Sequence, residues 1–181
     1  QTWTMPEKGS NNNRNFIQDA LERVAKQIMR ETETLVIVDR DTKGISGHPP
    51  IMETIMEKID SCDVYVADVS YVMHNKNRFT PNPNVMIELG YALKSLNDRF
   101  ILVMNTAHGS PEDHALPFDF QHRRFPIKFH LEPDADTHTR RNQRDRLVRD
   151  LKHAIELVLE SPPKPIRDMV NTLKSSWNPD E

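Results

Sequence analysis

Apolar residues recur along the chain in two alternating patterns, one of helical period and one of short continuous runs. Apolar pairs that repeat every four positions over 16–29 predict a helix, which follows a cluster of asparagines suited to capping. The β-branched run at 35–38 and the run at 64–67 predict strands buried on both faces. The apolar positions of 51–59 predict a second helix between these two strands.

The second half of the chain repeats this alternation. The segment 71–81 is polar and is interpreted as an irregular loop. Asn82-Pro83 then predicts a helix start, because the residue before proline is pushed out of the helical region and proline suits the first helical position. Three further apolar patterns predict two strands and a long charged helix, at 100–104, 125–131 and 137–160.

Strands that alternate with helices predict an α/β fold with a parallel sheet flanked by helices on both faces. The first predicted helix has no strand before it, since residues 1–10 hold too few apolar side chains. A doubly wound sheet normally has that strand near its centre, so we expect it upstream of Gln1, or its remnant at Thr2–Thr4. We expect one α/β domain over 1–160, then a proline-rich linker and a short segment over 161–181.

Composition excludes several classes of protein. Of the 181 residues, 36% are hydrophobic and 28% are charged, and no apolar run approaches the length of a membrane-spanning helix. We therefore expect no membrane partner. The net charge of -3 gives no overall attraction to nucleic acid, and Asp145 and Asp150 offset the arginines of 140–149. A single cysteine, Cys62, excludes an internal disulfide and indicates a reducing compartment, so we expect a cytoplasmic location.

Motifs for phosphate and metal binding are absent from the sequence. The five glycines form neither the glycine-rich dinucleotide fingerprint nor a P-loop. The eight histidines lack the spacing of a zinc site, and no second cysteine exists to help them. We therefore predict no metal and no resident cofactor.

Polar residues follow the predicted strands at the edge where an open parallel sheet binds ligands. Asp39-Arg40-Asp41 follows one strand, Asp68 and Ser70 follow the next, and the helix that begins at Asn82 comes after them. Because the carboxyl ends of parallel strands share one edge, we expect these groups to converge. The sequence leaves open whether Asp68 and Ser70 bind a ligand or only turn the chain, and whether Arg40 pairs with Asp41 on the surface.

Several segments resemble bacterial Toll/interleukin-receptor-like (TIR-like) domains, and their order and spacing match as well. They are Asn13–Ile17, Val38–Asp41 with Gly47–Ile51 (second strand and BB loop), Cys62–Ser70 (third strand), Asn82–Leu93 (acidic helix) and Leu116–Asp119. The similarity covers about residues 11–131. It implies a flavodoxin-like, TIR-like parallel sheet.

The resemblance also implies an activity. In enzymatic TIR domains a glutamate of the acidic helix cleaves NAD+ at the nicotinamide ribose, and by position that residue is Glu88. NAD+ is then a substrate, and the protein is an antiphage effector activated by assembly or by a partner protein or domain. Self-assembly is expected through the BB-like loop 41–50. The candidate substrate-binding residues are Asn84, Asp68, Ser70, Arg40, Arg14 and Tyr91.

One carboxylate is sufficient for this chemistry. Nicotinamide leaves as a neutral molecule from a cationic pyridinium, so no general acid has to protonate it. The remaining ribose has oxocarbenium character, as in glycoside hydrolysis. A carboxylate can stabilise that cation, hold the ribose hydroxyls or form a covalent adduct.

Other interpretations of the same helix stay open. Glu88–Ala92 also resembles nucleoside 2-deoxyribosyltransferases, whose glutamate is the nucleophile, although that family lacks the BB-like loop. Asn84 stands where TIR enzymes often have tryptophan, which keeps a non-catalytic adaptor or nucleotide-binding module open. Glu88 can also be an ordinary solvated helix glutamate. Gly90 costs helix stability and is interpreted as a point of close approach by a ligand or a strand.

Overall fold

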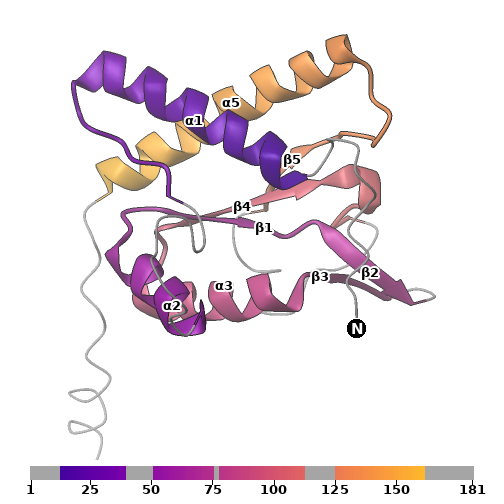
Figure 1. Ribbon diagram of the computed structural model, residues 1–181, viewed down its shortest axis with the longest axis horizontal. Coiled ribbons are helices and arrows are strands. Elements are labelled where there is room, and N and C mark those ends of the chain that lie inside the picture. The colour runs from indigo at the N-terminus through magenta and orange to yellow at the C-terminus, as the bar shows by residue number, and fades with distance from the viewer. Residues whose placement is uncertain (1–12, 40–50, 76–77, 113–124, 162–181) are drawn as a thin grey trace, which may run out of the picture.

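A three-stranded parallel sheet is the centre of the fold (Figure 1). The computed structural model describes residues 13–39, 51–75, 78–112 and 125–161. The strand order is β1-β4-β5, with bounds β1 Tyr65–Asp68, β4 Phe100–Asn105 and β5 Ile127–Phe129. Tyr65 pairs with Phe100, and Val103 pairs with Ile127. The predicted α/β class and parallel sheet are confirmed.

Helices cover both faces of this sheet (Figure 1). α1 (Asn13–Thr32) and α5 (Thr137–Glu160) pack together over one face, and α2 (Ile51–Ser61) and α3 (Pro83–Ser95) lie on the other. All four helices were predicted from the sequence. α3 begins where the sequence predicted, because Pro83 is its first residue and the Asn82 side chain accepts a hydrogen bond from the Asn84 N–H.

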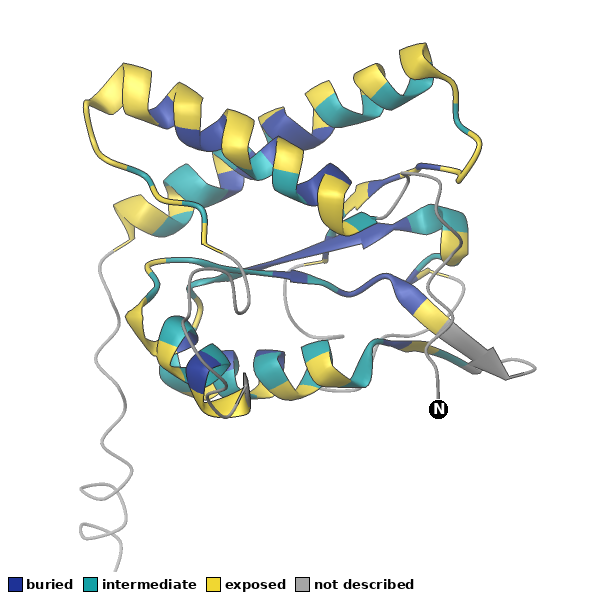
Figure 2. Cartoon of the chain, viewed as in Figure 1, coloured by how far each residue is buried: buried dark blue, intermediate teal, exposed yellow. Residues whose placement is uncertain are grey.

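The alternation of side chains along β4 divides the core into two layers. Ile101 and Val103 pack with the buried faces of α1 and α5, whereas Leu102 and Met104 pack against α3. Figure 2 shows the result as buried stripes on the inner faces of the helices and exposed residues on their outer faces. Each fully buried large apolar side chain contributes roughly 1.5–3 kcal/mol, so this division holds both helix layers on the sheet.

The strand predicted at 35–38 is not formed. Residues 33–39 leave α1 without pairing with any strand in the described part of the chain. Leu35 and Ile37 are 72% and 76% exposed, while Val36 packs on the α1 side of the core. A β-branched run favours a strand only where a neighbouring strand supplies hydrogen bonds and a packing surface. β1 is an edge strand among the described residues, and nothing described pairs with its second edge.

The segment interpreted as an irregular loop, 71–81, contains an antiparallel hairpin instead. β2 (Tyr71–Asn75) pairs with β3 (Arg78–Pro81), with an irregular register between Tyr71 and Met73. The rings of Tyr71 and Phe79 lie 5.5 Å apart across the two strands. Such a cross-strand aromatic pair stabilises a hairpin that the polar composition hides.

Several expected features lie outside the described residues. They are the strand remnant at Thr2–Thr4, the BB-like loop 41–50, the segment Leu116–Asp119, and the linker with its following segment, of which only Ser161 is described. Of the helices in the described ranges, none combines the length and apolarity needed to cross a membrane.

Candidate active site around Glu88

Glu88 lies in the second turn of α3 and is half-buried. Its Oε2 accepts a hydrogen bond of 3.1 Å from the Tyr65 hydroxyl. Burial raises the pKa of Glu88 above its usual value, and the hydrogen bond from Tyr65 opposes this rise. A solvated surface glutamate has neither burial nor a fixed partner, so Glu88 differs from that interpretation.

Tyr65 is the first residue of β1, and its ring lies where α2 and α3 meet. It packs against two clusters, one containing Leu89 and the other containing Ile59 and Ala92. Burial, followed by the negative charge of Glu88, raises the pKa of Tyr65. The phenol therefore stays protonated and acts as a permanent donor to the carboxylate.

Two of the predicted substrate-binding residues share a face of α3 with Glu88. Asn84 is one turn before it and Tyr91 almost one turn after it. The Asn84 side chain is exposed. The Tyr91 hydroxyl donates to Asp60 Oδ2 of α2 over 2.6 Å, and this bond raises the pKa of Tyr91. Tyr91 thus ties α3 to α2, and Asn84 is left facing solvent.

Asp68 and Ser70 form a second polar cluster, at the carboxyl end of β1. The Ser70 hydroxyl donates to Asp68 Oδ1 and accepts a 2.7 Å hydrogen bond from the Asn105 N–H. Burial raises the pKa of Asp68, while hydrogen bonds from Ser70 and Asn13 oppose the rise. The predicted pair therefore lies together, with partners on β4 and α1.

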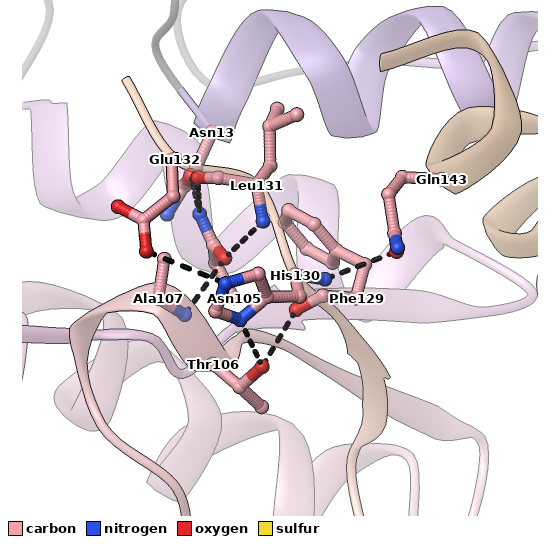
Figure 3. A network of polar contacts seen from close by, with 9 residues as sticks. All are labelled: Asn13, Asn105, Thr106, Ala107, Phe129, His130, Leu131, Glu132 and Gln143. Atoms are coloured by element: carbon pink, nitrogen blue, oxygen red, sulfur yellow. Dashed lines mark hydrogen bonds and ion pairs between the residues drawn. The ribbon is translucent and has the colours of Figure 1, made fainter. Parts of the chain in front are cut away.

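Asn105, the last residue of β4, connects this cluster to the rest of the carboxyl edge. Figure 3 shows the bonds of its side chain. Its side chain is 1% exposed. Oδ1 accepts from the N–H groups of Leu131 and Ala107, and Nδ2 donates to Asn13 Oδ1 and to the Leu131 carbonyl. Every donor and acceptor of the amide is satisfied. Sequence reasoning missed this residue, and its position directly after an apolar strand was the available signal.

The two clusters lie on opposite faces of the sheet. Tyr65 and Ala67 point toward α3, whereas Val66 packs on the α1 side and Asp68 bonds with Asn13 of α1. No hydrogen bond or ion pair of the described residues joins Glu88 to Asp68, Ser70 or Asn84. The expected convergence of these groups on one edge is therefore not seen in the described contacts.

The remaining predicted site residues are dispersed. Arg14 is exposed in the first turn of α1, on the sheet face opposite α3. Asp39 forms an ion pair of 2.8 Å with Lys58 of α2, and Arg40 and Asp41 lie outside the described residues. This ion pair connects the end of the 33–39 segment to α2.

Gly90 does not mark a close approach within the described structure. The residue is exposed, and a Cβ built there meets no atom within 4 Å. The expectation of a strand against this glycine is wrong for the described residues, because α3 turns this position outward, whereas the expectation of a ligand there stays a prediction. Nothing in the structure explains why a glycine occurs there.

Two further features of the described residues concern ligand binding, a groove and the arrangement of metal-ligating side chains. A shallow groove of about 370 Å³ lies between α1 and α5, on the sheet face opposite Glu88, and is lined by Arg23, Lys26, Gln27, Arg30, Asp145 and Val148. Across the described ranges, no group of three His, Cys, Asp or Glu side chains has the arrangement of a metal site.

Comparison with known proteins returned no relative. No protein-family model matches the chain, and no curated protein or solved structure is significantly similar to it.

Proposed function

We propose that this chain is a TIR-like NAD+ glycohydrolase or ADP-ribosyl cyclase in which Glu88 acts at the nicotinamide–ribose bond. The observation that carries the proposal is the setting of Glu88, half-buried and held by the Tyr65 hydroxyl in the second turn of a helix on the sheet. A carboxylate with restricted rotamers and reduced solvation interacts more strongly with developing positive charge than a solvated one.

The chemistry follows from the charge of the substrate. Departure of neutral nicotinamide leaves a cationic ribose, and the negative charge of Glu88 stabilises that cation or forms a bond to its anomeric carbon. Attack by water then gives the linear product, whereas attack within the nucleotide gives the cyclic one. The step needs ionised Glu88, so activity falls as pH decreases through its raised pKa.

The proposal extends to regulation and setting. The resemblance of 38–51 and 82–93 to TIR-like effectors supports an antiphage role, activated by assembly or by a partner protein or domain. The BB-like loop 41–50 is the proposed contact between copies of the chain. The flavodoxin-like, TIR-like form of the sheet belongs to the same proposal.

The test uses concentrated, assembled full chain with NAD+, and separately with a panel of deoxynucleosides, and follows release of nicotinamide and of free base. We expect nicotinamide release by the wild type and by Glu57→Gln, which changes an exposed glutamate of α2. Base release without loss of NAD+ selects a 2-deoxyribosyltransferase-like enzyme. Assembly without turnover of any substrate selects a non-catalytic adaptor or nucleotide-binding module.

A further inference from the structure

Tyr65 is held by its backbone and by the packing of its ring. Its backbone N–H donates to the Arg99 carbonyl over 3.1 Å at the start of β1. Tyr65 also packs against two clusters, which contain Ile59 of α2 and Leu89 and Ala92 of α3. The hydroxyl cannot move far unless α2 and α3 repack, so it is a fixed donor for any group that reaches it.

The hydrogen bond selects one arrangement of a flexible side chain. A glutamate on a helix has several rotamers of similar energy, and binding one of its oxygens to a fixed donor removes most of them. Oε2 of Glu88 is the atom that Tyr65 holds. Within the described ranges, no donor bonds to Oε1, so the two oxygens of this carboxylate have different surroundings.

Two influences set the pKa of Glu88, namely burial and the hydrogen bond from Tyr65. The other titratable groups near this pair are neutral or bonded elsewhere. From the turn before β1, Cys62 has a pKa raised by burial and stays a neutral thiol. From α2, Asp60 accepts the hydrogen bond of Tyr91 and is occupied there. Tyr65 is the group of β1 that bonds to Glu88, and its effect favours the ionised carboxylate.

We infer that Tyr65 is a positioning residue of the proposed site, holding Glu88 Oε2 so that Oε1 is presented to the ribose. This inference rests on the proposed function. Tyr65 itself transfers no proton and makes no bond to substrate. Tyr65 restricts the orientation of the Glu88 carboxylate and extends the pH range in which that carboxylate is charged. A phenylalanine at position 65 keeps the packing of the ring but lacks the hydroxyl that has these two effects.

The test compares Tyr65→Phe with Cys62→Ala, which changes the same α2–α3 seam without touching Glu88. We expect Tyr65→Phe to lower kcat for NAD+ roughly tenfold, with KM changed by less than about twofold, as for one charge-assisted hydrogen bond lost in the transition state. The acidic limb of the pH profile should move to higher pH, because the opposing effect of the hydrogen bond on the Glu88 pKa is gone. Cys62→Ala should leave that limb in place.

A second measurement is independent of activity. The Glu88 carboxyl carbon, followed by NMR across a pH titration and assigned with Glu88→Gln, should titrate at higher pH in Tyr65→Phe than in the wild type. An unchanged Glu88 titration overturns the role of Tyr65, whether or not NAD+ is consumed. A wild type that consumes no NAD+ but shows the shift rejects the proposed function and leaves the control of Glu88 by Tyr65 standing. NAD+ turnover that needs Glu88 but has the same kcat and pH profile in Tyr65→Phe overturns only the role of Tyr65.

Discussion

Glu88 and Asp68 are both partly buried carboxylates with pKa values raised by burial, yet they lie on opposite faces of the parallel sheet. Glu88 bonds with Tyr65 at the amino end of β1, and Asp68 lies three residues later, at the end of the strand. Each strand residue adds roughly 3.3 Å, so the two positions are also about 10 Å apart along β1. Asp68 is therefore too far from Glu88 to act as a second carboxylate in the same reaction. The proposed cleavage of NAD+ needs only one carboxylate.

Asp68 should make stability depend on pH in a particular direction. Burial raises its pKa above 3.8 in the folded state, so the folded state binds the proton more tightly than the unfolded state. Its contribution is fully present below that ordinary value and is lost as pH rises through the raised pKa. Relative to Asp68→Asn, the wild type should lose stability as pH rises from the ordinary value of 3.8 through the raised pKa, as measured by urea unfolding.

Asp19→Asn, at an exposed position of α1, is the control for the removal of one negative charge. A stability difference between the wild type and Asp68→Asn that stays constant, or that changes in favour of the wild type as pH rises, contradicts the burial of Asp68.

Asn105 should be required for stability. Replacement by alanine removes the hydrogen bonds of the buried Leu131 N–H and carbonyl, and those of part-buried groups of Asn13 and Ala107. Each unsatisfied buried group costs roughly 1–3 kcal/mol, so we expect a loss of at least about 2 kcal/mol in the free energy of unfolding. Asn142→Ala, at an exposed site of α5, should change it by less than about 0.5 kcal/mol. Equal effects of the two substitutions are incompatible with the network in Figure 3.

Gly90→Ala should stabilise the protein. The position is exposed in α3, and the added Cβ meets open space. Alanine is better than glycine in a helix by about 1 kcal/mol, which raises Tm by roughly 2–4 °C for a chain of this size. Thermal unfolding measures this, with the buried Ala92→Gly as the reverse control. Destabilisation by Gly90→Ala means that something lies against this face of α3.

Substitutions in residues 35–38 test whether the predicted strand is absent. Leu35→Thr and Ile37→Thr should each change the free energy of unfolding by less than about 0.5 kcal/mol, because both side chains are exposed. Val36→Ala should cost more, about 1 kcal/mol, since Val36 is half-buried against the α1-side core. Chemical denaturation of the three variants gives the comparison. A larger loss from Leu35 or Ile37 than from Val36 indicates that this segment is packed on its outer side.

Sequence patterns predicted those features whose causes are local. The start of α3 follows from Asn82 and Pro83 alone, and the helices follow from apolar periodicity within each segment. The hairpin was missed because Tyr71 and Phe79 support each other only after the chain has turned. The strand at 35–38 was predicted wrongly because propensity cannot show whether a neighbouring strand is present.

The sequence indicated one residue of the candidate site but not the partners that lie far from it in the chain. Glu88 was selected by its place in α3, but its partner Tyr65 lies 23 positions earlier, and no local pattern links the two residues. Asn105 has partners at 13, 70 and 131, and no local pattern links these positions. Contacts of that range follow from the sheet order, which the sequence specifies only through the whole fold.

The most direct test of the central claim is nicotinamide release from NAD+ by Glu88→Gln, compared with wild type at equal concentration and assembly. Glutamine keeps the size of the side chain and can accept the Tyr65 hydrogen bond, but it carries no negative charge. We expect the variant to unfold at a temperature close to that of the wild type and to release nicotinamide at least about a hundredfold more slowly, as for loss of a charge that stabilises the transition state. Equal rates for the two proteins contradict the assignment of Glu88.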